Sequence, residues 1–176
     1  MPGFPRPRLV RPLHRRYRDA MNASDPTRPE AATPVAKSIF RSADTVDDLN
    51  RYSRNTSIEQ LGIVFTQIGP DYVRGTMPVD ARTHQPYGLL HGGASVLLAE
   101  TLGSSAGNLC CPEGKICVGI EINANHVRGV RSGTVTGTAR PIHIGGSTQV
   151  WDIRIEDEIG ALVCISRLTL AVVPKL

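Results

Sequence analysis

No stretch of this sequence is both long and apolar enough to indicate a membrane-spanning helix. The best candidate covers residues 89–111, and Glu100 interrupts it short of the roughly 18 consecutive apolar residues that a bilayer requires. The sequence also has no P-loop, no dinucleotide-binding glycine motif and no HExxH motif. We therefore expect neither an integral membrane protein nor a nucleotide-binding or HExxH-type zinc enzyme.

Cysteine is scarce, and its spacing excludes the common zinc-ligand patterns. The four cysteines are Cys110, Cys111, Cys117 and Cys164, and no two of them form a Cys-x-x-Cys pair. Adjacent cysteines rarely bond to each other, so Cys110 and Cys111 do not indicate a disulfide. We interpret all four as free thiols, mostly core residues, in a cytoplasmic protein, and we expect no metal site.

Charge is unevenly distributed along the chain. The formal net charge is +4, but residues 1–20 contain six Arg and one Asp and carry +5, which leaves −1 for the remainder. The excess of basic over acidic residues therefore lies in the N-terminal segment and does not indicate a nucleic-acid-binding domain. This segment lacks the apolar centre of a secretory signal and is rich in proline. We expect residues 1–40 to be a disordered, basic, Pro-rich extension and residues 41–176 to be one domain.

Hydrophobic periodicity predicts one long buried helix among antiparallel strands. Helices are expected at residues 44–55, with Ser42 or Asp44 as the cap, and at residues 91–108. Strands are expected at residues 61–68, 72–79, 116–125, 134–142, 147–155 and 162–173. The second helix has no polar stripe, so it must be covered on most sides. We predict an α+β fold in which an antiparallel sheet of about six strands wraps around one long central helix.

The segment formed by residues 84–100 has the most informative composition. Glu100 is the only Asp, Glu, Lys or Arg in residues 89–111. A carboxylate among apolar residues is costly unless it is compensated or retained for chemistry. Gly92 and Gly93 stand at the start of the helix, where free N–H groups and the helix dipole favour a negatively charged oxygen. The pattern indicates an oxyanion-stabilising site with Glu100 as the reactive acid.

Three sequence blocks resemble the hotdog-fold acyl-CoA thioesterases. They are QPYGLLHGG at residues 85–93 with Ala99 and Glu100, EINANHVR at 121–128, and HIG at 143–145 with QVW at 149–151. The resemblance covers roughly residues 45–173. It is strongest to the PaaI-like branch, which includes the hydroxybenzoyl-CoA and dihydroxynaphthoyl-CoA thioesterases and the enterobactin proofreading thioesterase. It implies a hotdog fold and hydrolysis of a thioester.

The resemblance also assigns roles to individual residues. It implies that Gln85 and His91 polarise or position the thioester carbonyl. The Gly92 N–H at the helix start is the natural oxyanion donor, because glycine lets a substrate approach the backbone closely. Glu100 would be the nucleophile or the general base. Ser104, one turn further along the helix, can hydrogen-bond its carboxylate or the attacking water.

The spacing of these residues predicts an oligomer. Gly92 and Glu100 are eight residues apart, which is about 12 Å along a helix. One carbonyl carbon cannot lie close to both. We therefore expect a homodimer in which each site takes one half from each copy, and the resemblance suggests a homotetramer formed as a dimer of dimers.

The remaining candidates would bind the carrier. Arg128 and Arg131 are suited to the phosphates of coenzyme A, and the glycine-containing stretch 143–148 could hydrogen-bond pantetheine or phosphate. The candidate substrate- and CoA-binding residues are Gly119, His126, Val127, Arg128, Gly129, His143, Ile144, Gly145, Gly146, Ser147 and Thr148. We expect no cofactor apart from coenzyme A as part of the substrate, and no nucleic-acid or membrane partner.

The function expected from these features is hydrolysis of an aromatic or medium-chain acyl-CoA to the free acid and CoA. A hotdog acyl-CoA or acyl-ACP dehydratase is one alternative, although the set of Gln85, His91 and Glu100 fits hydrolysis better. The other alternative is a non-catalytic acyl-CoA-binding module. Release of free thiol from acyl-CoA substrates distinguishes these possibilities.

Overall fold

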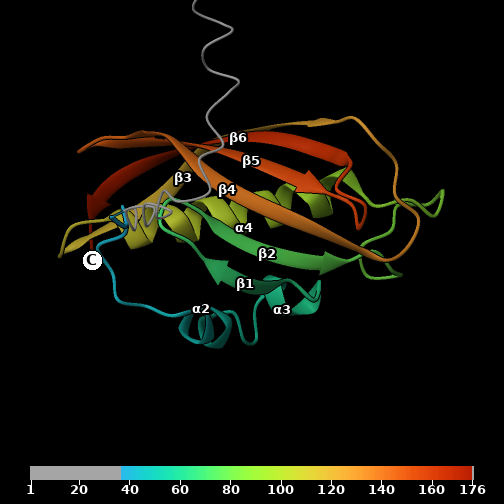
Figure 1. The fold of residues 1–176 in the computed structure, drawn as a ribbon, viewed down its shortest axis with the longest axis horizontal. Coiled ribbons are helices and arrows are strands. Elements are labelled where there is room, and N and C mark those ends of the chain that lie inside the picture. Colours follow the sequence, from blue (N-terminus) through green and yellow to red (C-terminus); the bar gives the residue numbers. More distant parts are fainter. Residues whose placement is uncertain (1–36, 176) are drawn as a thin grey trace, which may run out of the picture. The chain divides into compact units, whose positions relative to one another are not determined.

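The computed structural model describes residues 37–175, and within this range the chain forms one antiparallel sheet and three helices (Figure 1). The helices are α2 (Val46–Tyr52), α3 (Ser57–Gln60) and α4 (Gly92–Cys110). The strands are β1 (Val64–Ile68), β2 (Val73–Pro78), β3 (Lys115–His126), β4 (Thr134–Ile144), β5 (Thr148–Glu156) and β6 (Leu162–Pro174). Their order in the sheet is β1-β2-β4-β5-β6-β3, and every neighbouring pair is antiparallel.

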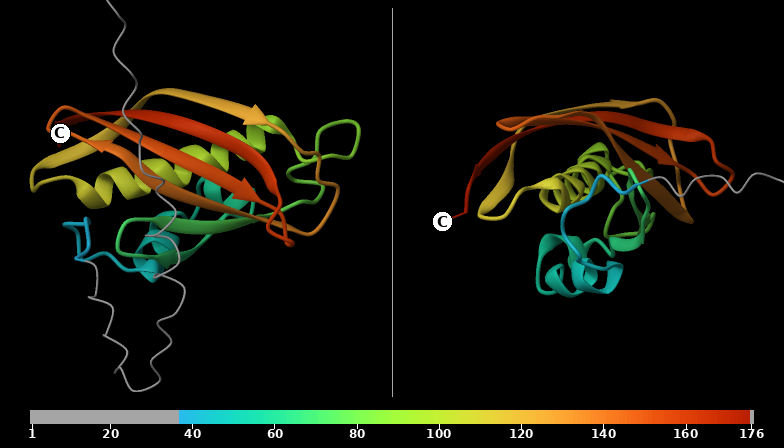
Figure 2. Two further views of the ribbon diagram at one scale, coloured as in Figure 1. Left: turned by 45° about the horizontal axis from the view of Figure 1, so that its top comes forward. Right: turned by 60° about the vertical axis from the view of Figure 1, so that its left-hand side comes forward.

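The sheet curls over α4, as the sequence predicts (Figure 2). α4 contacts β2, β3, β4, β5 and β6, so its apolar side chains are covered from several directions. Small residues permit this close packing: a side chain at Gly103 or Gly107 would come within 2.6 Å of Leu168 or 2.4 Å of Leu170 on β6. The six-stranded antiparallel sheet and the long central helix confirm the predicted fold class.

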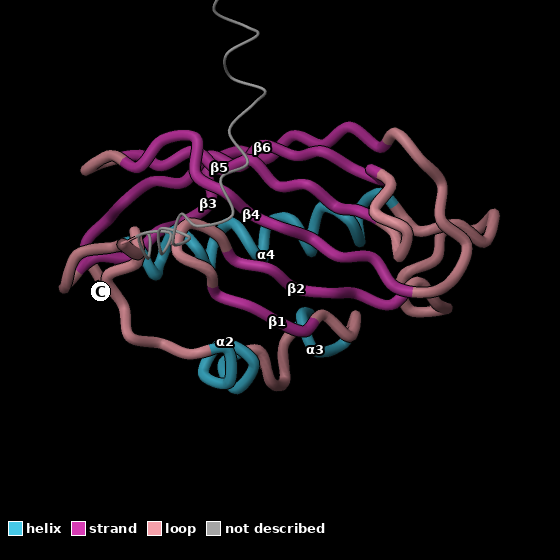
Figure 3. Tube along the Cα trace, in the orientation of Figure 1, coloured by secondary structure: helices cyan, strands magenta, loops and turns pink. Residues whose placement is uncertain are grey.

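The N-terminal part of the domain differs from the prediction in three details. Thr45 caps α2, rather than Ser42 or Asp44, because its side chain accepts from the Asp48 N–H while the Asp48 carboxylate accepts from the Thr45 N–H. The short helix α3 follows where sequence periodicity indicated nothing regular (Figure 3). Ile39, which the sequence analysis placed in the extension, donates a backbone hydrogen bond to Pro70 and packs on the core.

β3 forms one edge of the sheet and contains a β-bulge between Gly119 and Glu121. In the sequence, apolar residues alternate regularly along this strand, at Ile116, Val118, Ile120 and Ile122. The bulge shifts the alternation by one residue, so Cys117 faces α4 before it and Ile122 faces α4 after it. Ile120, which lies at the bulge, is 62% exposed.

The predicted extension at residues 1–36 lies outside the described part of the chain. Within residues 37–175, no helix has the length and apolarity needed to cross a membrane.

Candidate active site

The N-terminus of α4 leaves one backbone donor free. His91 caps the helix, and its Nδ1 accepts a hydrogen bond from the Gly93 N–H at 2.8 Å. The Ala94 and Ser95 N–H groups both donate to the His91 carbonyl, at 3.0 and 3.2 Å. Within the described residues the Gly92 N–H has no hydrogen-bond acceptor. It is therefore the donor of the first turn that a ligand can use.

The same cap determines which nitrogen of His91 can donate. Because Nδ1 accepts from the Gly93 N–H, the proton of the neutral imidazole resides on Nε2. The side chain of His91 lies at the surface, so Nε2–H is available to a ligand. The first turn of α4 thus offers a side-chain donor in addition to the Gly92 N–H.

Gln85 is oriented by a hydrogen bond within its own loop. Its Oε1 accepts from the Tyr87 N–H at 2.6 Å. The amide oxygen is therefore engaged, and the amide NH₂ is the group left to contact a substrate. An NH₂ donor is what polarisation of a thioester carbonyl requires.

The loop that carries Gln85 is attached to the segment that follows β3. The Leu90 N–H donates to the Val130 carbonyl at 2.8 Å, and Nε2 of His84 lies 2.9 Å from the Arg131 carbonyl. These contacts hold the loop in place from two sides. Leu89 of the same loop lies beside Gly129, since a first side-chain carbon there would be 3.3 Å from Leu89.

Glu100 lies in the middle of α4, against β3. A side chain at Gly119 would place its first carbon 2.5 Å from Oε1 of Glu100, so the carboxylate occupies the space that this carbon would fill. Ser104 donates to the same oxygen at 3.4 Å. Burial raises the pKa of Glu100, and the Ser104 hydrogen bond partly opposes that rise. A raised pKa suits a group that exchanges protons near neutral pH.

Gly119 lies against Glu100 in the structure. It is predicted as a substrate- or CoA-binding residue, whereas the contact that the structure gives it is with Glu100. The sequence offers no direct signal for this contact, because it depends on how β3 lies against α4.

His126 lies at the other end of β3, next to the start of α4. Its Nε2 would be 2.8 Å from a first side-chain carbon at Gly92. Gly119 and His126 are seven residues apart and would face opposite sides of a regular strand. The bulge between Gly119 and Glu121 corrects the alternation, so both residues face α4.

Within one protomer the two groups of candidate residues remain apart. Gln85, His91 and His126 lie with Gly92 at the N-terminal end of α4. Glu100 follows Gly92 by eight residues, which is about 12 Å along the helix axis. A single chain therefore holds the predicted carbonyl-binding donors at one place and the carboxylate that is predicted to react at another.

The two predicted CoA-binding segments also lie at different ends of the sheet. Val127, Arg128 and Gly129 follow β3 at the end that contains His126, and all three are exposed. The β4–β5 hairpin (His143, Ile144, Gly145, Gly146, Ser147 and Thr148) lies at the opposite end, because Thr148 and Val118 both pair with Ala171.

Fewer backbone groups of this hairpin are free to bind a ligand than the sequence suggested. The Gly145 N–H donates to the Thr148 carbonyl at 2.9 Å, and the Ser147 carbonyl accepts from the Val172 N–H at 2.9 Å. The His143 ring folds over Gly145, since a first side-chain carbon there would lie 2.6 Å from Nε2. A side chain at Gly146, by contrast, would meet no atom within 4 Å. Gly146 is therefore the open position of this hairpin.

A cavity of about 300 Å³ beside α4 was not anticipated from the sequence. It lies between α2, α3, β1 and the C-terminal half of α4, and its α4 wall is formed by Ser105, Asn108 and Leu109. Asn108 is four residues beyond Ser104 and eight beyond Glu100. Extending the Glu100–Ser104 helix face by one more turn would have identified Asn108 from the sequence.

The four cysteines are free and buried, as expected. Cys111 Sγ and Cys117 Sγ lie 3.2 Å apart without a bond between them. Burial raises the pKa of Cys117 to about 12 and that of Cys110 to about 11. Such thiols remain protonated and poorly nucleophilic at neutral pH. In the part of the chain from residue 37 to 175, no group of three or more His, Cys, Asp or Glu side chains is arranged to hold a metal ion.

Comparison with known proteins identifies relatives along most of the domain. The family model described as the thioesterase superfamily matches residues 87–164. A putative esterase of Vibrio cholerae is 58% identical over 135 residues, covering 77% of this chain and 90% of the relative. A 1,4-dihydroxy-2-naphthoyl-CoA hydrolase of Escherichia coli is 52% identical over 134 residues, covering 76% and 98%. A crystal structure of a Haemophilus influenzae thioesterase has a TM-score of 0.76 and 51% identity, covering 77% of this chain and 95% of that one.

The architecture and these similarities define a hotdog-fold enzyme. The chain belongs to the thioesterase superfamily and is a thioester hydrolase. This membership favours hydrolysis over the dehydratase and the non-catalytic binding module that the sequence left open. The roles of individual site residues remain predictions.

Proposed function

We propose that the protein hydrolyses an aromatic or medium-chain acyl-CoA at sites shared between two copies of the chain. The thioester would be held by Gln85, His91 and Gly92 of one protomer and attacked with the help of Glu100 of the other. Support for a CoA thioester comes from the E. coli relative, which is named as a hydrolase of 1,4-dihydroxy-2-naphthoyl-CoA. The aromatic substrate class is likewise suggested by that relative's name.

The observation that carries this proposal is a pair of contacts on the edge strand β3. Glu100 lies against Gly119, and Gly92 lies against His126. The outer edge of β3 has no partner strand within the described chain, and Val118 on it is 42% exposed. Antiparallel pairing of two β3 strands about a twofold axis between Ile122 and Asn123, midway between Gly119 and His126, would place Gly119 of one protomer opposite His126 of the other. Glu100 of one copy would then lie near Gly92 of the second copy.

The chemistry follows from this placement. The Gln85 NH₂, the His91 Nε2–H and the Gly92 N–H would stabilise the oxyanion that forms when the thioester carbonyl is attacked. Ionised Glu100 would either attack the carbonyl carbon or remove a proton from the attacking water. In both cases the C–S bond breaks, CoA leaves as the thiol, and water supplies the oxygen of the product acid.

The finer features of the protein are also proposals. Arg128 would bind a CoA phosphate, and the exposed Gly146 turn would contact the carrier. Two dimers would associate into a tetramer. The cysteines form no Cys-x-x-Cys pair, and we propose the cytoplasm as the compartment.

The test combines two inactive variants. Gln85→Ala and Glu100→Gln are purified separately and as co-expressed mixed dimers, and free thiol is measured with benzoyl-CoA and a medium-chain acyl-CoA. Each variant alone should retain at most about one hundredth of wild-type activity. In a mixed dimer, one site receives both intact residues and the other receives both substitutions. A statistical mixture should therefore recover about a quarter of wild-type activity.

A site confined to one protomer predicts a different result. Every site in the mixture would then carry one substitution, and no activity would return. The matched control is the double variant Gln85→Ala/Glu100→Gln co-expressed with wild-type chain. If the variants fail to complement, the shared site is wrong. If the wild-type protein releases no thiol from any acyl-CoA, the proposed substrate class is wrong.

A further inference from the structure

Asn108, near the C-terminal end of α4, binds the backbone of β3 at a single residue. Its Oδ1 accepts from the Cys117 N–H at 2.9 Å, and its Nδ2 donates to the Cys117 carbonyl at 3.4 Å. The same Nδ2 donates to the Ser104 carbonyl at 2.9 Å, which ties the amide to the preceding turn of the helix. One side chain therefore satisfies both backbone groups of Cys117.

These two backbone groups belong to the outer edge of β3. Cys117 lies opposite Val172 of β6. The Val172 N–H donates to the Ser147 carbonyl, on the side of β5, so Cys117 and Val172 form one of the antiparallel pairs that exchange no hydrogen bonds. The N–H and carbonyl of Cys117 consequently point away from β6, to the side where another strand could pair. At Cys117, Asn108 occupies the place of that strand.

The part of the edge that is left for another strand begins two residues further on. Backbone groups alternate in direction along a strand, so those of Gly119 point to the same side as those of Cys117. Gly119 lies against Glu100, and in the proposed pairing it faces His126 of the second copy. The edge that Asn108 leaves open thus begins at the residue where the proposed pairing begins.

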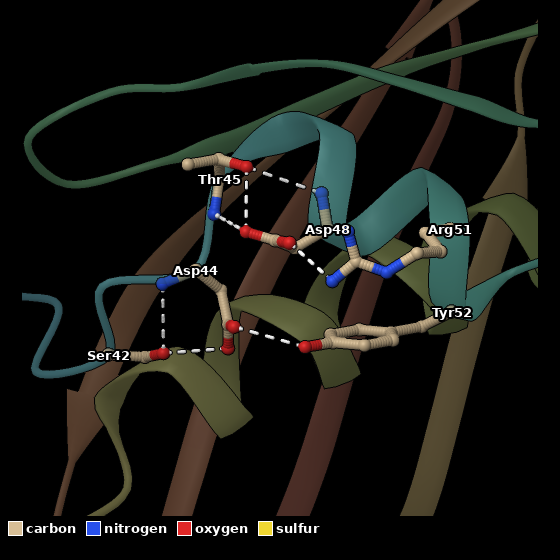
Figure 4. A network of polar contacts seen from close by, with 6 residues as sticks. All are labelled: Ser42, Asp44, Thr45, Asp48, Arg51 and Tyr52. Carbon is tan, nitrogen blue, oxygen red and sulfur yellow. Dashed lines mark hydrogen bonds and ion pairs between the residues drawn. The ribbon is translucent and has the colours of Figure 1, made fainter.

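The polar side chains on the α2 side of the neighbouring cavity are engaged with one another. The Tyr52 hydroxyl donates to Oδ1 of Asp44 at 3.3 Å, and the Ser42 hydroxyl donates to Oδ2 of Asp44 at 2.7 Å (Figure 4). Asn108 lines the same cavity, but the hydrogen bonds of its amide run to α4 and β3. Its contacts therefore belong to the junction of helix and strand and not to the wall of the cavity.

We propose that Asn108 is a positioning residue: by occupying the β3 edge at Cys117, it fixes the register in which a second copy of the chain pairs along β3. This inference rests on the proposed function, in which Glu100 of one copy acts beside Gly92 of the other. If Cys117 were free, the strands could slip by two residues and bring His126 opposite Cys117. The slip would lengthen the paired edge at both ends.

The pattern of side chains does not prevent such a slip, because a shift of two residues leaves every side chain on its own face of the sheet. The slip would move the two copies by about 7 Å along each other. A misplacement of about 1 Å already costs about 10²-fold in rate, so the slipped pair would be inactive. A group that blocks the longer pairing is therefore what the shared site requires.

Two cysteine reporters on the outer face of β3 distinguish the registers. Glu121 and Asn123 lie side by side there, with 3.3 Å between Oε1 of Glu121 and Nδ2 of Asn123. In the proposed register Asn123 is next to the twofold axis, so two copies of Asn123→Cys can form a disulfide. In the slipped register Glu121 takes that place. The other reporter is then displaced by three residues, about 10 Å, beyond the roughly 7 Å that a disulfide spans.

Each reporter is oxidised with diamide in the wild-type background and in Asn108→Ala, and disulfide-linked dimers are measured on a non-reducing gel. With Asn108 present, Asn123→Cys should cross-link and Glu121→Cys should not. Asn108→Ala should shift the ratio of the two cross-links about ten-fold toward Glu121→Cys, because both freed backbone groups gain a hydrogen bond in the slipped pair. Thiol release from benzoyl-CoA should fall in the same proportion as the Asn123→Cys cross-link.

The control variant is Asn125→Ala, which removes the same amide from an exposed position on β3 and should leave the ratio of cross-links unchanged. The chain without an added cysteine gives the background of its four native thiols, which are buried. Thermal unfolding shows whether each variant is folded.

Failure of this inference differs from failure of the proposed function. If Asn108→Ala leaves the cross-links unchanged, the inference is overturned while the shared site stands. If it lowers both cross-links together with the unfolding temperature, Asn108 only stabilises the fold, and the inference is likewise overturned. A shift toward Glu121→Cys supports the inference even if the wild-type protein releases no thiol from any acyl-CoA. If Asn123→Cys forms no disulfide with Asn108 present, both the pairing and the inference are wrong.

Discussion

Replacement of Gly119 by alanine tests the placement of Glu100 without changing the carboxylate itself. The new carbon would lie 2.5 Å from Oε1 of Glu100, whereas ordinary contacts begin near 3.4 Å. The carboxylate must therefore move by about 0.9 Å, the difference between these two values. A displacement of about 1 Å in a reacting group can lower the rate by about 10²-fold. Because the end of a side chain can yield, we expect the fold to survive.

The expected outcome for Gly119→Ala is a fall in kcat of about 10²-fold with a much smaller change in KM. Thiol release from benzoyl-CoA measures both constants, and thermal unfolding checks the fold. Glu121→Ala is the control, since Glu121 follows the bulge on the same strand and is exposed. A Gly119→Ala enzyme that turns over at the wild-type rate would refute the reasoning, because the observed position of the carboxylate would then be irrelevant to catalysis.

Three further predictions concern ionisation. Burial raises the pKa of Glu100 above the ordinary 4.5, so the acidic limb of the pH profile of kcat/KM should have its midpoint above pH 4.5. A midpoint at or below that pH would contradict the assignment of Glu100 as the reactive acid. A raised pKa also means that the folded protein binds the Glu100 proton more tightly than the unfolded chain does. The free energy of unfolding therefore falls as pH rises through the folded pKa of Glu100. Glu100→Gln should therefore unfold at a higher temperature than wild type at about pH 8, with the difference shrinking in acid. The pKa of Cys117 is raised to about 12, so this thiol should resist alkylation by iodoacetamide in the native protein and react after denaturation. Peptide mass spectrometry measures the labelling. Rapid labelling of the native protein would contradict the burial of Cys117.

The sequence was sufficient to predict the architecture because the elements are long and their periodicity is uninterrupted. The helix that became α4 has no polar stripe, so it must be covered on most sides, and the six predicted strands supply that cover. The short helix α3 has only four residues, too few for periodicity to identify. The cap of α2 was misplaced because Ser42, Asp44 and Thr45 are all good capping residues, and tertiary contacts decide among them.

The geometry of the candidate site was predictable where it depends on the local backbone, and not where it depends on packing between distant segments. A histidine before two glycines at a helix start identifies the cap and the free N–H from neighbouring residues alone. The contact between Glu100 and Gly119 depends instead on the bulge in β3, which shifts the alternation by one residue. The bulge leaves no distinct signal in the sequence.

The unpaired edge of β3 and the accessible face of α4 both bear on how two copies of the chain could associate. An unpaired edge of 12 residues invites association with other strands unless something covers it. On the neighbouring helix, Glu100 and Ser104 are only partly buried, so the carboxylate lies where a second copy could reach it. Pairing two β3 strands would satisfy the free backbone groups and would also bring Glu100 to the donors of the other protomer. The same association would then serve both stability and catalysis, and a substitution that weakens it should reduce both together.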